Sequence, residues 1–148
     1  MTSTDQPSIL FACRANAGRS VTGKVLAERY AGDRVAVFSA GSEPGEHVHP
    51  EVAAVLASMG LDTDRETPKG FDPDGQYTAV VTMGCGEACP FYAGARYEDW
   101  ELEDPKGQDE ATVRRIVTDI DTRVRELLVR LVPDLELPPS VVEPGASR

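Results

Sequence analysis

The chain has 148 residues, of which 41% are hydrophobic and 27% are charged, so it is long enough to bury one real core. Its formal net charge of −10 argues against binding along a nucleic-acid backbone, because phosphates attract clustered Lys and Arg. No segment has the roughly 18 apolar residues of a membrane span, and residues 1–7 lack the apolar core of a secretion signal. We therefore expect a cytoplasmic protein that binds neither nucleic acid nor membranes.

Strand and helix patterns alternate from residue 8 onward. Residues 8–13, SILFAC, form an apolar run typical of a buried strand, and the helical pattern after it stops at Gly32. Residues 34–40 predict a second strand, so this part of the chain is a βαβ unit with parallel strands. Pro50 suits the first turn of the next helix, which Gly60 ends.

The second half of the chain continues this alternation. Residues 77–83, YTAVVTM, predict a third strand, and the alternating aromatic and polar residues of 96–102 predict an edge strand. Asp109 can cap the last helix, whose apolar residues keep helical spacing as far as Leu131. Strands that alternate with helices indicate a three-layer α/β domain.

The pattern indicates a single domain with polar ends. We expect the domain over residues 8–132, after a flexible N-terminus at residues 1–7. Residues 133–148 are polar and rich in proline, which predicts a flexible tail.

Residues 13–20, CRANAGRS, lie between the first strand and the first helix, where ligands bind in open α/β sheets. Small residues allow backbone N–H groups to converge on an anion, and the helix N-terminus adds positive potential. Arg19 can close the ring with its two-pronged guanidinium, and the Cys13 thiol in that field is expected to act as a thiolate nucleophile. The predicted oxyanion-binding residues are Arg14, Ala15, Asn16, Ala17, Gly18 and Arg19. A buried cysteine before an ordinary turn is the alternative.

Cys85 and Cys89 are the other two of the three cysteines. In a reducing cytoplasm, an odd number of thiols favours a reactive thiol with partners over a disulfide framework. Cys13 and Cys85 each follow a parallel strand, so they can meet at one edge of the sheet. On a helical turn, Cys85 and Cys89 would have Cα atoms about 6 Å apart, within disulfide range. The alternatives are residues without a role, or half of a zinc site; no metal is expected, because His47 and His49 lie away from every motif.

Asp104 precedes Pro105 in an acidic stretch after the fourth predicted strand. A carboxyl group here could protonate a leaving oxygen. On spacing alone, an ordinary turn in a charged surface segment is the simpler interpretation.

These segments resemble the low-molecular-weight tyrosine phosphatase superfamily and, within it, the thiol-coupled arsenate reductases. The resemblance is carried over about residues 8 to 130 by ILFACRANAGRS, FSAGSEP, ETPKG, VVTMGCGEACP and RYEDWELEDPKGQ. It implies a flavodoxin-like fold with a four-stranded parallel sheet of order 2-1-3-4, flanked by helices. One departure is Ala15, where this family often has Gly.

The resemblance also implies roles for individual residues. Cys13 would be the nucleophile and Arg19 would hold the oxyanion, while Asn16 shapes the loop. Ser20 would hydrogen-bond the Cys13 thiolate. Asp104 would be the general acid on a loop above the nucleophile.

Arsenate reduction gives the three thiols a use. Attack of Cys13 on arsenate would form a thiol–arsenic(V) adduct, and a second thiolate would release arsenite by forming a disulfide with Cys13. We expect Cys85 to attack first and Cys89 second, although the reverse order is open. No bound cofactor is expected, since thioredoxin would restore the thiols, with a low-molecular-weight thiol as the alternative donor. The same loop should accept other tetrahedral oxyanions, such as phosphate and sulfate.

Two other functions compete with this one. A tyrosine phosphatase would need only Cys13, Arg19 and Asp104. Phosphatases of this family have aromatic residues just after the Asp-Pro pair, whereas Lys106 and Gly107 follow it here. An arsenite sensor that binds the metalloid through three thiolates would leave Arg19 without a purpose.

Overall fold

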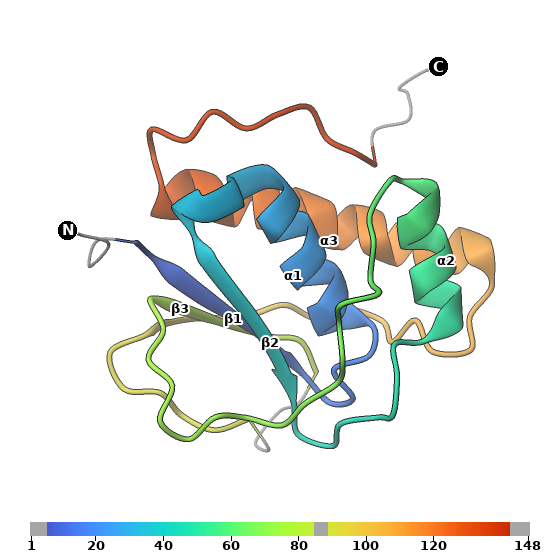
Figure 1. The fold of residues 1–148 in the computed structure, drawn as a ribbon, viewed down its shortest axis with the longest axis horizontal. Coiled ribbons are helices and arrows are strands. Elements are labelled where there is room, and N and C mark those ends of the chain that lie inside the picture. Colours follow the sequence, from blue (N-terminus) through green and yellow to red (C-terminus); the bar gives the residue numbers. More distant parts are fainter. Residues whose placement is uncertain (1–5, 85–88, 143–148) are drawn as a thin grey trace.

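The computed structural model describes residues 6–84 and 89–142. Its strands are β1 (Ser8–Cys13), β2 (Ala36–Gly41), β3 (Ala79–Thr82) and β4 (Arg96–Asp99). They form one parallel sheet in the order β2-β1-β3-β4 (Figure 1), which confirms the predicted fold and order. Five of the six β1 residues are buried, because β1 has a strand on each edge and packed layers on both faces.

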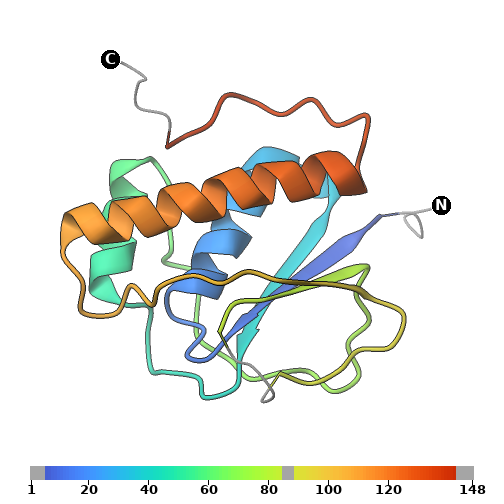
Figure 2. The same ribbon diagram turned by 180° about the vertical axis from the view of Figure 1, so that it is seen from behind.

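The helices are α1 (Arg19–Ala31), α2 (Pro50–Ser58) and α3 (Glu110–Leu131), and a short 3-10 turn over Gly32–Arg34 follows α1. All three helices contribute to the main core against one face of the sheet (Figures 1 and 2). Asp109 caps α3 as predicted, since its carboxylate accepts a hydrogen bond from the Thr112 N–H at 2.9 Å.

The opposite face of the sheet has a smaller apolar cluster. Leu10 and Val80 from the central strands pack there with Tyr92, and Phe71 and Tyr77 lie against them. These three aromatic residues lie in loops, so in the described part of the chain this face is covered by irregular structure.

The segment after α3 has specific attachments. Asp121 of α3 is 2% exposed and accepts hydrogen bonds from Tyr30 and, at 2.7 Å, from Ser140. The Tyr30 hydroxyl in turn accepts the Val141 N–H at 3.0 Å. The proline-rich composition predicted a flexible tail; its described part reaches Val142, which is 8% exposed. These contacts tie residues 133–142 to α1 and α3, while the flexibility itself stays a prediction.

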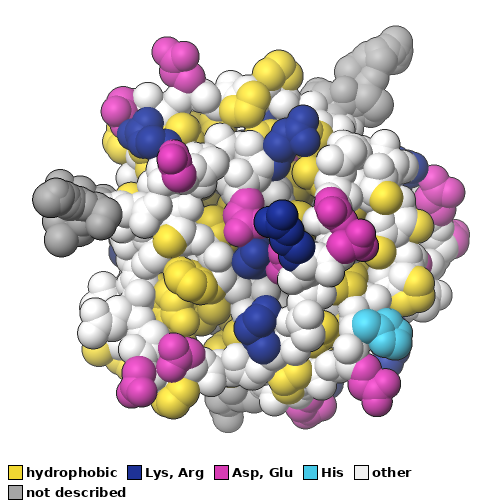
Figure 3. All heavy atoms as spheres, in the orientation of Figure 1, with side chains coloured by type: hydrophobic (Ala, Val, Ile, Leu, Met, Phe, Trp, Pro, Cys, Tyr) yellow, Lys and Arg dark blue, Asp and Glu magenta, His cyan; other side chains and the backbone are white. Residues whose placement is uncertain are grey.

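The surface carries charges of both signs despite the net charge of −10. On the face in Figure 3, acidic and basic side chains lie interspersed. No helix of the described residues is long and apolar enough to cross a bilayer.

Replacing Tyr30 by Phe should destabilise the protein by about 1–3 kcal/mol, because the buried Asp121 carboxylate and the Val141 N–H each lose a partner. The measurement is urea unfolding. Tyr77→Phe is the matched control, since the Tyr77 hydroxyl makes no hydrogen bond within the described residues. Equal unfolding midpoints for the two variants would contradict a stabilising role for this network.

Candidate active site

The loop between β1 and α1 is held by its carbonyl groups. The carbonyl oxygens of Cys13, Arg14, Ala15 and Ala17 accept hydrogen bonds of 2.7–3.1 Å from backbone N–H groups in residues 42–49. Within the described residues, none of the N–H groups of residues 14–18 donates to another backbone group. With the carbonyls engaged on one side, these N–H groups remain available to an anion on the other.

Asn16 fixes the shape of this loop. It is fully buried and has a φ of 50°, a left-handed conformation that asparagine tolerates better than most residues. Its amide donates to the Ser20 hydroxyl at 2.8 Å, and its carbonyl oxygen accepts the Lys69 N–H at 3.0 Å. Asn16 therefore connects the loop to α1 on one side and to the segment before β3 on the other.

The Cys13 thiol is free, 2% exposed, and lies with its Sγ 2.9 Å from the Ser20 Oγ. Because the Asn16 amide already donates to that oxygen, the Ser20 proton can point at the sulfur. A hydroxyl donor at this distance stabilises a thiolate more than a neutral thiol. The chain Asn16–Ser20–Cys13 therefore favours a nucleophilic sulfur.

The Arg19 guanidinium lies among three segments. Its Nη1 donates to the Leu102 carbonyl at 3.4 Å, and its Nη2 lies 3.8 Å from a carboxylate oxygen of Asp104. Gly84 packs so closely that a Cβ there would lie 2.5 Å from Nη1. Only 11% of the Arg19 side chain is exposed, so the cation has few other positions available.

These groups surround a cavity of about 330 Å³. Its lining consists of Cys13, Arg14, Ala15, Gly18, Arg19, Glu43, Gly45, His49, Asp104 and Lys106. Three cations and two carboxylates thus face a space suited to a small oxyanion. Asp104 and Cys13, 91 positions apart in the chain, meet here because β1 and β4 both end at this edge of the parallel sheet.

His49 corrects one sequence prediction. We expected both histidines to lie away from every motif, yet His49 lines the cavity, while His47 is exposed. The His49 N–H donates to the Ala17 carbonyl at 2.9 Å, and its ring lies beside Gly18. Sequence reasoning also missed Glu43, because no local pattern showed that residues 42–49 return to the loop, whereas Lys106 lines the cavity beside Asp104 as the sequence comparison with phosphatases suggested.

The other two cysteines are Cys85 and Cys89, of which Cys85 lies outside the described residues. Cys89 is disulfide-bonded, and Cys13 does not take part in that bond because it is free. Among the residues that the structure describes, no group of three or more His, Cys, Asp or Glu side chains could hold a metal.

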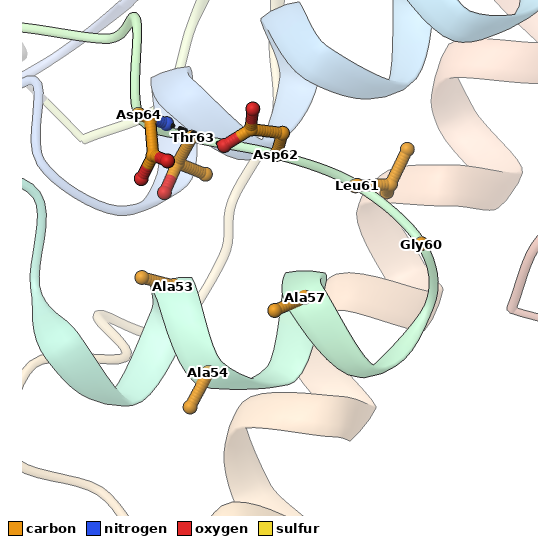
Figure 4. Close-up of a pocket in the computed structure, with 8 residues that line it drawn as sticks. All are labelled: Ala53, Ala54, Ala57, Gly60, Leu61, Asp62, Thr63 and Asp64. Carbon is orange, nitrogen blue, oxygen red and sulfur yellow. Dashed lines mark hydrogen bonds between the residues drawn. The ribbon is translucent and has the colours of Figure 1, made fainter.

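A larger hollow of about 530 Å³ lies between α2 and residues 60–64 (Figure 4). Alanines of α2 line one side of it, and Asp62 and Asp64 line the other. Its lining contains neither a thiol nor a basic side chain. It therefore lacks the groups that would bind or attack an oxyanion.

Residues 8–88 match the model of the low molecular weight phosphotyrosine protein phosphatase family. The chain belongs to this family. The match covers β1, β3 and the thiol loop, which is the segment of residues 13–18 between β1 and α1, and it confirms the predicted resemblance.

Relatives of this phosphatase-family chain include arsenate reductases. A solved thioredoxin-dependent arsenate reductase of Corynebacterium glutamicum is 40% identical in sequence and superposes with a TM-score of 0.77. The match covers 88% of this chain and 64% of that protein, so this chain spans less than two thirds of its length. The arsenate reductase of Bacillus subtilis is 32% identical over 80% of this chain and 92% of its own. The glutaredoxin arsenate reductase of Synechocystis is 29% identical over 83% and 97%.

Replacing Gly84 by Ala should weaken oxyanion binding at least tenfold, because the new methyl group would displace the Arg19 guanidinium. The measurement is the Kd for phosphate by titration calorimetry. Gly94→Ala is a matched control: both glycines have a positive φ, but a Cβ at Gly94 meets no atom within 4 Å. If both variants bind phosphate like the wild type, Arg19 does not hold the anion.

Proposed function

We propose that this protein reduces arsenate to arsenite, with Cys13 as the nucleophile. The observation that carries this proposal is the shared cavity, in which a hydrogen-bonded thiol faces the Arg19 guanidinium and the Asp104 carboxyl. The unengaged N–H groups of residues 14–18 complete a site for a tetrahedral oxyanion. Phosphate and sulfate have the same shape and charge, so they should compete for it.

The first step joins sulfur to arsenic. The Cys13 sulfur attacks arsenate, an S–As bond forms, and one arsenate oxygen leaves as water with a proton supplied by Asp104. Arsenic remains in the +5 state at this stage. Arg19 and the loop N–H groups hold the remaining oxygens, whose negative charge they balance.

The second step transfers two electrons. A Cys85 thiolate attacks the Cys13 sulfur, the S–S bond forms, and the electron pair of the broken S–As bond stays on arsenic, which leaves as arsenite. Cys89 then attacks Cys85 and releases the Cys13 thiolate. Gly84, which precedes Cys85 in the sequence, packs on Arg19, and the disulfide of Cys89 excludes Cys13. The position of Gly84 supports Cys85 as the first attacking thiol, whereas the disulfide of Cys89 supports a final thiol pair without Cys13 in either order.

We propose thioredoxin as the reductant, because the oxidised product is a protein disulfide, and we place the enzyme in the cytoplasm, where thiols are kept reduced. No bound cofactor is needed. A low-molecular-weight thiol is the alternative. It would attack the arsenic adduct directly and leave Cys85 and Cys89 without a role.

Phosphotyrosine hydrolysis is the second candidate, since Cys13, Arg19 and Asp104 line one cavity and would suffice for it. Lys106 lines the cavity where related phosphatases have aromatic residues. A charged side chain at this position disfavours a tyrosine ring and favours a small anion.

The role of the three thiols can be tested by following NADPH consumption with arsenate, thioredoxin and thioredoxin reductase. Cys13→Ser, Cys85→Ser and Cys89→Ser should each reduce turnover at least 100-fold, because each removes one thiol of the relay. After one turnover without reductant, the wild type should have lost two free thiols by mass spectrometry. The relay is wrong if Cys85→Ser and Cys89→Ser both turn over normally, and the reductase itself is wrong if arsenate drives no oxidation.

Ser20→Ala should lower kcat about tenfold or more, because the Cys13 sulfur loses its hydroxyl partner. Ser39→Ala is the matched control. Ser39 is also buried, at 4% exposure, but its hydroxyl has no hydrogen-bond partner in the described residues. We expect Ser39→Ala to retain wild-type kcat. Equal rates for both variants would show that the Ser20 hydroxyl does not assist the sulfur.

A further inference from the structure

Asp104 is weakly held by the site itself. Its side chain is 57% exposed, and its separation of 3.8 Å from Arg19 is too long for a hydrogen bond. Its other carboxylate oxygen accepts the Lys106 N–H at 3.1 Å, which fixes it only to its own turn. The direction of this carboxyl therefore depends on how the turn of residues 104–108 is attached to the rest of the protein.

One end of this turn rests on α1. Pro105 is buried, and a Cβ at Gly18 would lie 2.9 Å from the Pro105 ring, so the ring packs directly over the start of the helix. The Gln108 N–H donates to the Pro105 carbonyl at 3.1 Å and closes the turn internally. The buried proline ring fixes the turn at its Asp104 end, next to the ion pair between Glu103 and Arg115 at 2.7 Å.

The other end is attached to α2. Glu51, in the first turn of α2, accepts a hydrogen bond from the Gly107 N–H. Figure 2 shows the segment that leads into α3 passing the N-terminal end of α2. Gly107 has a φ of 74°, a conformation that glycine adopts readily, and this conformation is part of the turn that presents its N–H to the carboxylate.

The charge state of Glu51 suits this attachment. The hydrogen bond from Gly107 lowers the pKa of Glu51, and His49 acts in the same direction, while the Asp104 carboxyl opposes them. A lowered pKa in the folded state means that the carboxylate persists as the pH falls and is lost only below the usual range of Glu. Glu51 therefore stays an acceptor at neutral pH.

We infer that Glu51 is a positioning residue that holds the turn of residues 104–108 at Gly107 and so keeps the Asp104 carboxyl directed at the Cys13 site. The inference rests on the proposed function, in which Asp104 delivers a proton to the leaving oxygen. With Pro105 on α1 and Gly107 on α2, the turn has two fixed points, and Asp104 lies beside the first of them. Proton transfer requires such fixed geometry, since a shift of about 1 Å can slow a reaction by up to about 100-fold.

The test compares Glu51→Ala, Glu51→Gln and Glu110→Ala in arsenate reduction. Glu51→Ala should lower kcat about tenfold with a smaller change in the Kd for phosphate, because Arg19 and the loop N–H groups are untouched and only Lys106 moves with the turn. Glu51→Gln should restore most of the rate, since its amide oxygen can accept the same N–H. Glu110→Ala removes a carboxylate from the first turn of α3 whose one hydrogen-bond partner within residues 6–84 and 89–142 is Arg114, and it should retain wild-type kcat.

A double-mutant cycle and amide exchange make the outcome decisive. In an Asp104→Asn background, Glu51→Ala should cause no further loss of kcat, because Glu51 acts only through Asp104. Additive losses, or a wild-type kcat in Glu51→Ala, would overturn the inference while the reductase proposal stands. Should arsenate reduction itself fail, hydrogen exchange at the Gly107 amide still decides: Glu51→Ala should accelerate it at least tenfold, and unchanged exchange refutes the attachment.

Discussion

The hydrogen bonds between the thiol loop and residues 42–49 are the constraint on which the site depends. They engage the carbonyl oxygens of Cys13, Arg14, Ala15 and Ala17, so the N–H groups of the loop are available to face the cavity. A loop of this composition could otherwise form an ordinary turn, in which those N–H groups would donate hydrogen bonds to carbonyl groups of the turn itself. The close approach also requires Gly41, where a Cβ would lie 2.5 Å from the Arg14 carbonyl oxygen. The proposed anion site is thus built from backbone geometry in a protein whose net charge is negative.

Three strand ends bring the chemical groups together. Cys13 ends β1, Gly84 follows β3, and Asp104 follows β4, and parallel strands place all of these at one edge of the sheet. The proposed nucleophile, Cys13, is held by hydrogen bonds through the buried Ser20 and Asn16. The proposed acid instead lies on an exposed turn, which needs outside attachments.

Much of the fold could be predicted because it depends on local patterns. The apolar run of β1, the Asp109 cap and the regular stripe of α3 each fix an element without help from distant residues. The tail was harder, because the burial of Val142 and the bonds to Asp121 depend on partners far away in the sequence. Composition describes how a segment behaves alone, and it does not describe the surface on which the segment packs.

The sequence by itself determined which groups are proposed for the chemistry, because Cys13, Arg19 and Ser20 share one short loop whose spacing fixes their relation to a helix N-terminus. Only the tertiary structure decided what surrounds them. His49 belongs to a segment that returns to the loop through backbone hydrogen bonds, and such bonds leave no trace in side-chain patterns. Glu51 follows in α2, and its carboxylate accepts a hydrogen bond from Gly107, which is 56 positions away in the chain. Local residues surround the proposed nucleophile because its neighbours are covalently close, whereas the walls of the cavity come from long-range packing of segments that the sequence does not pair.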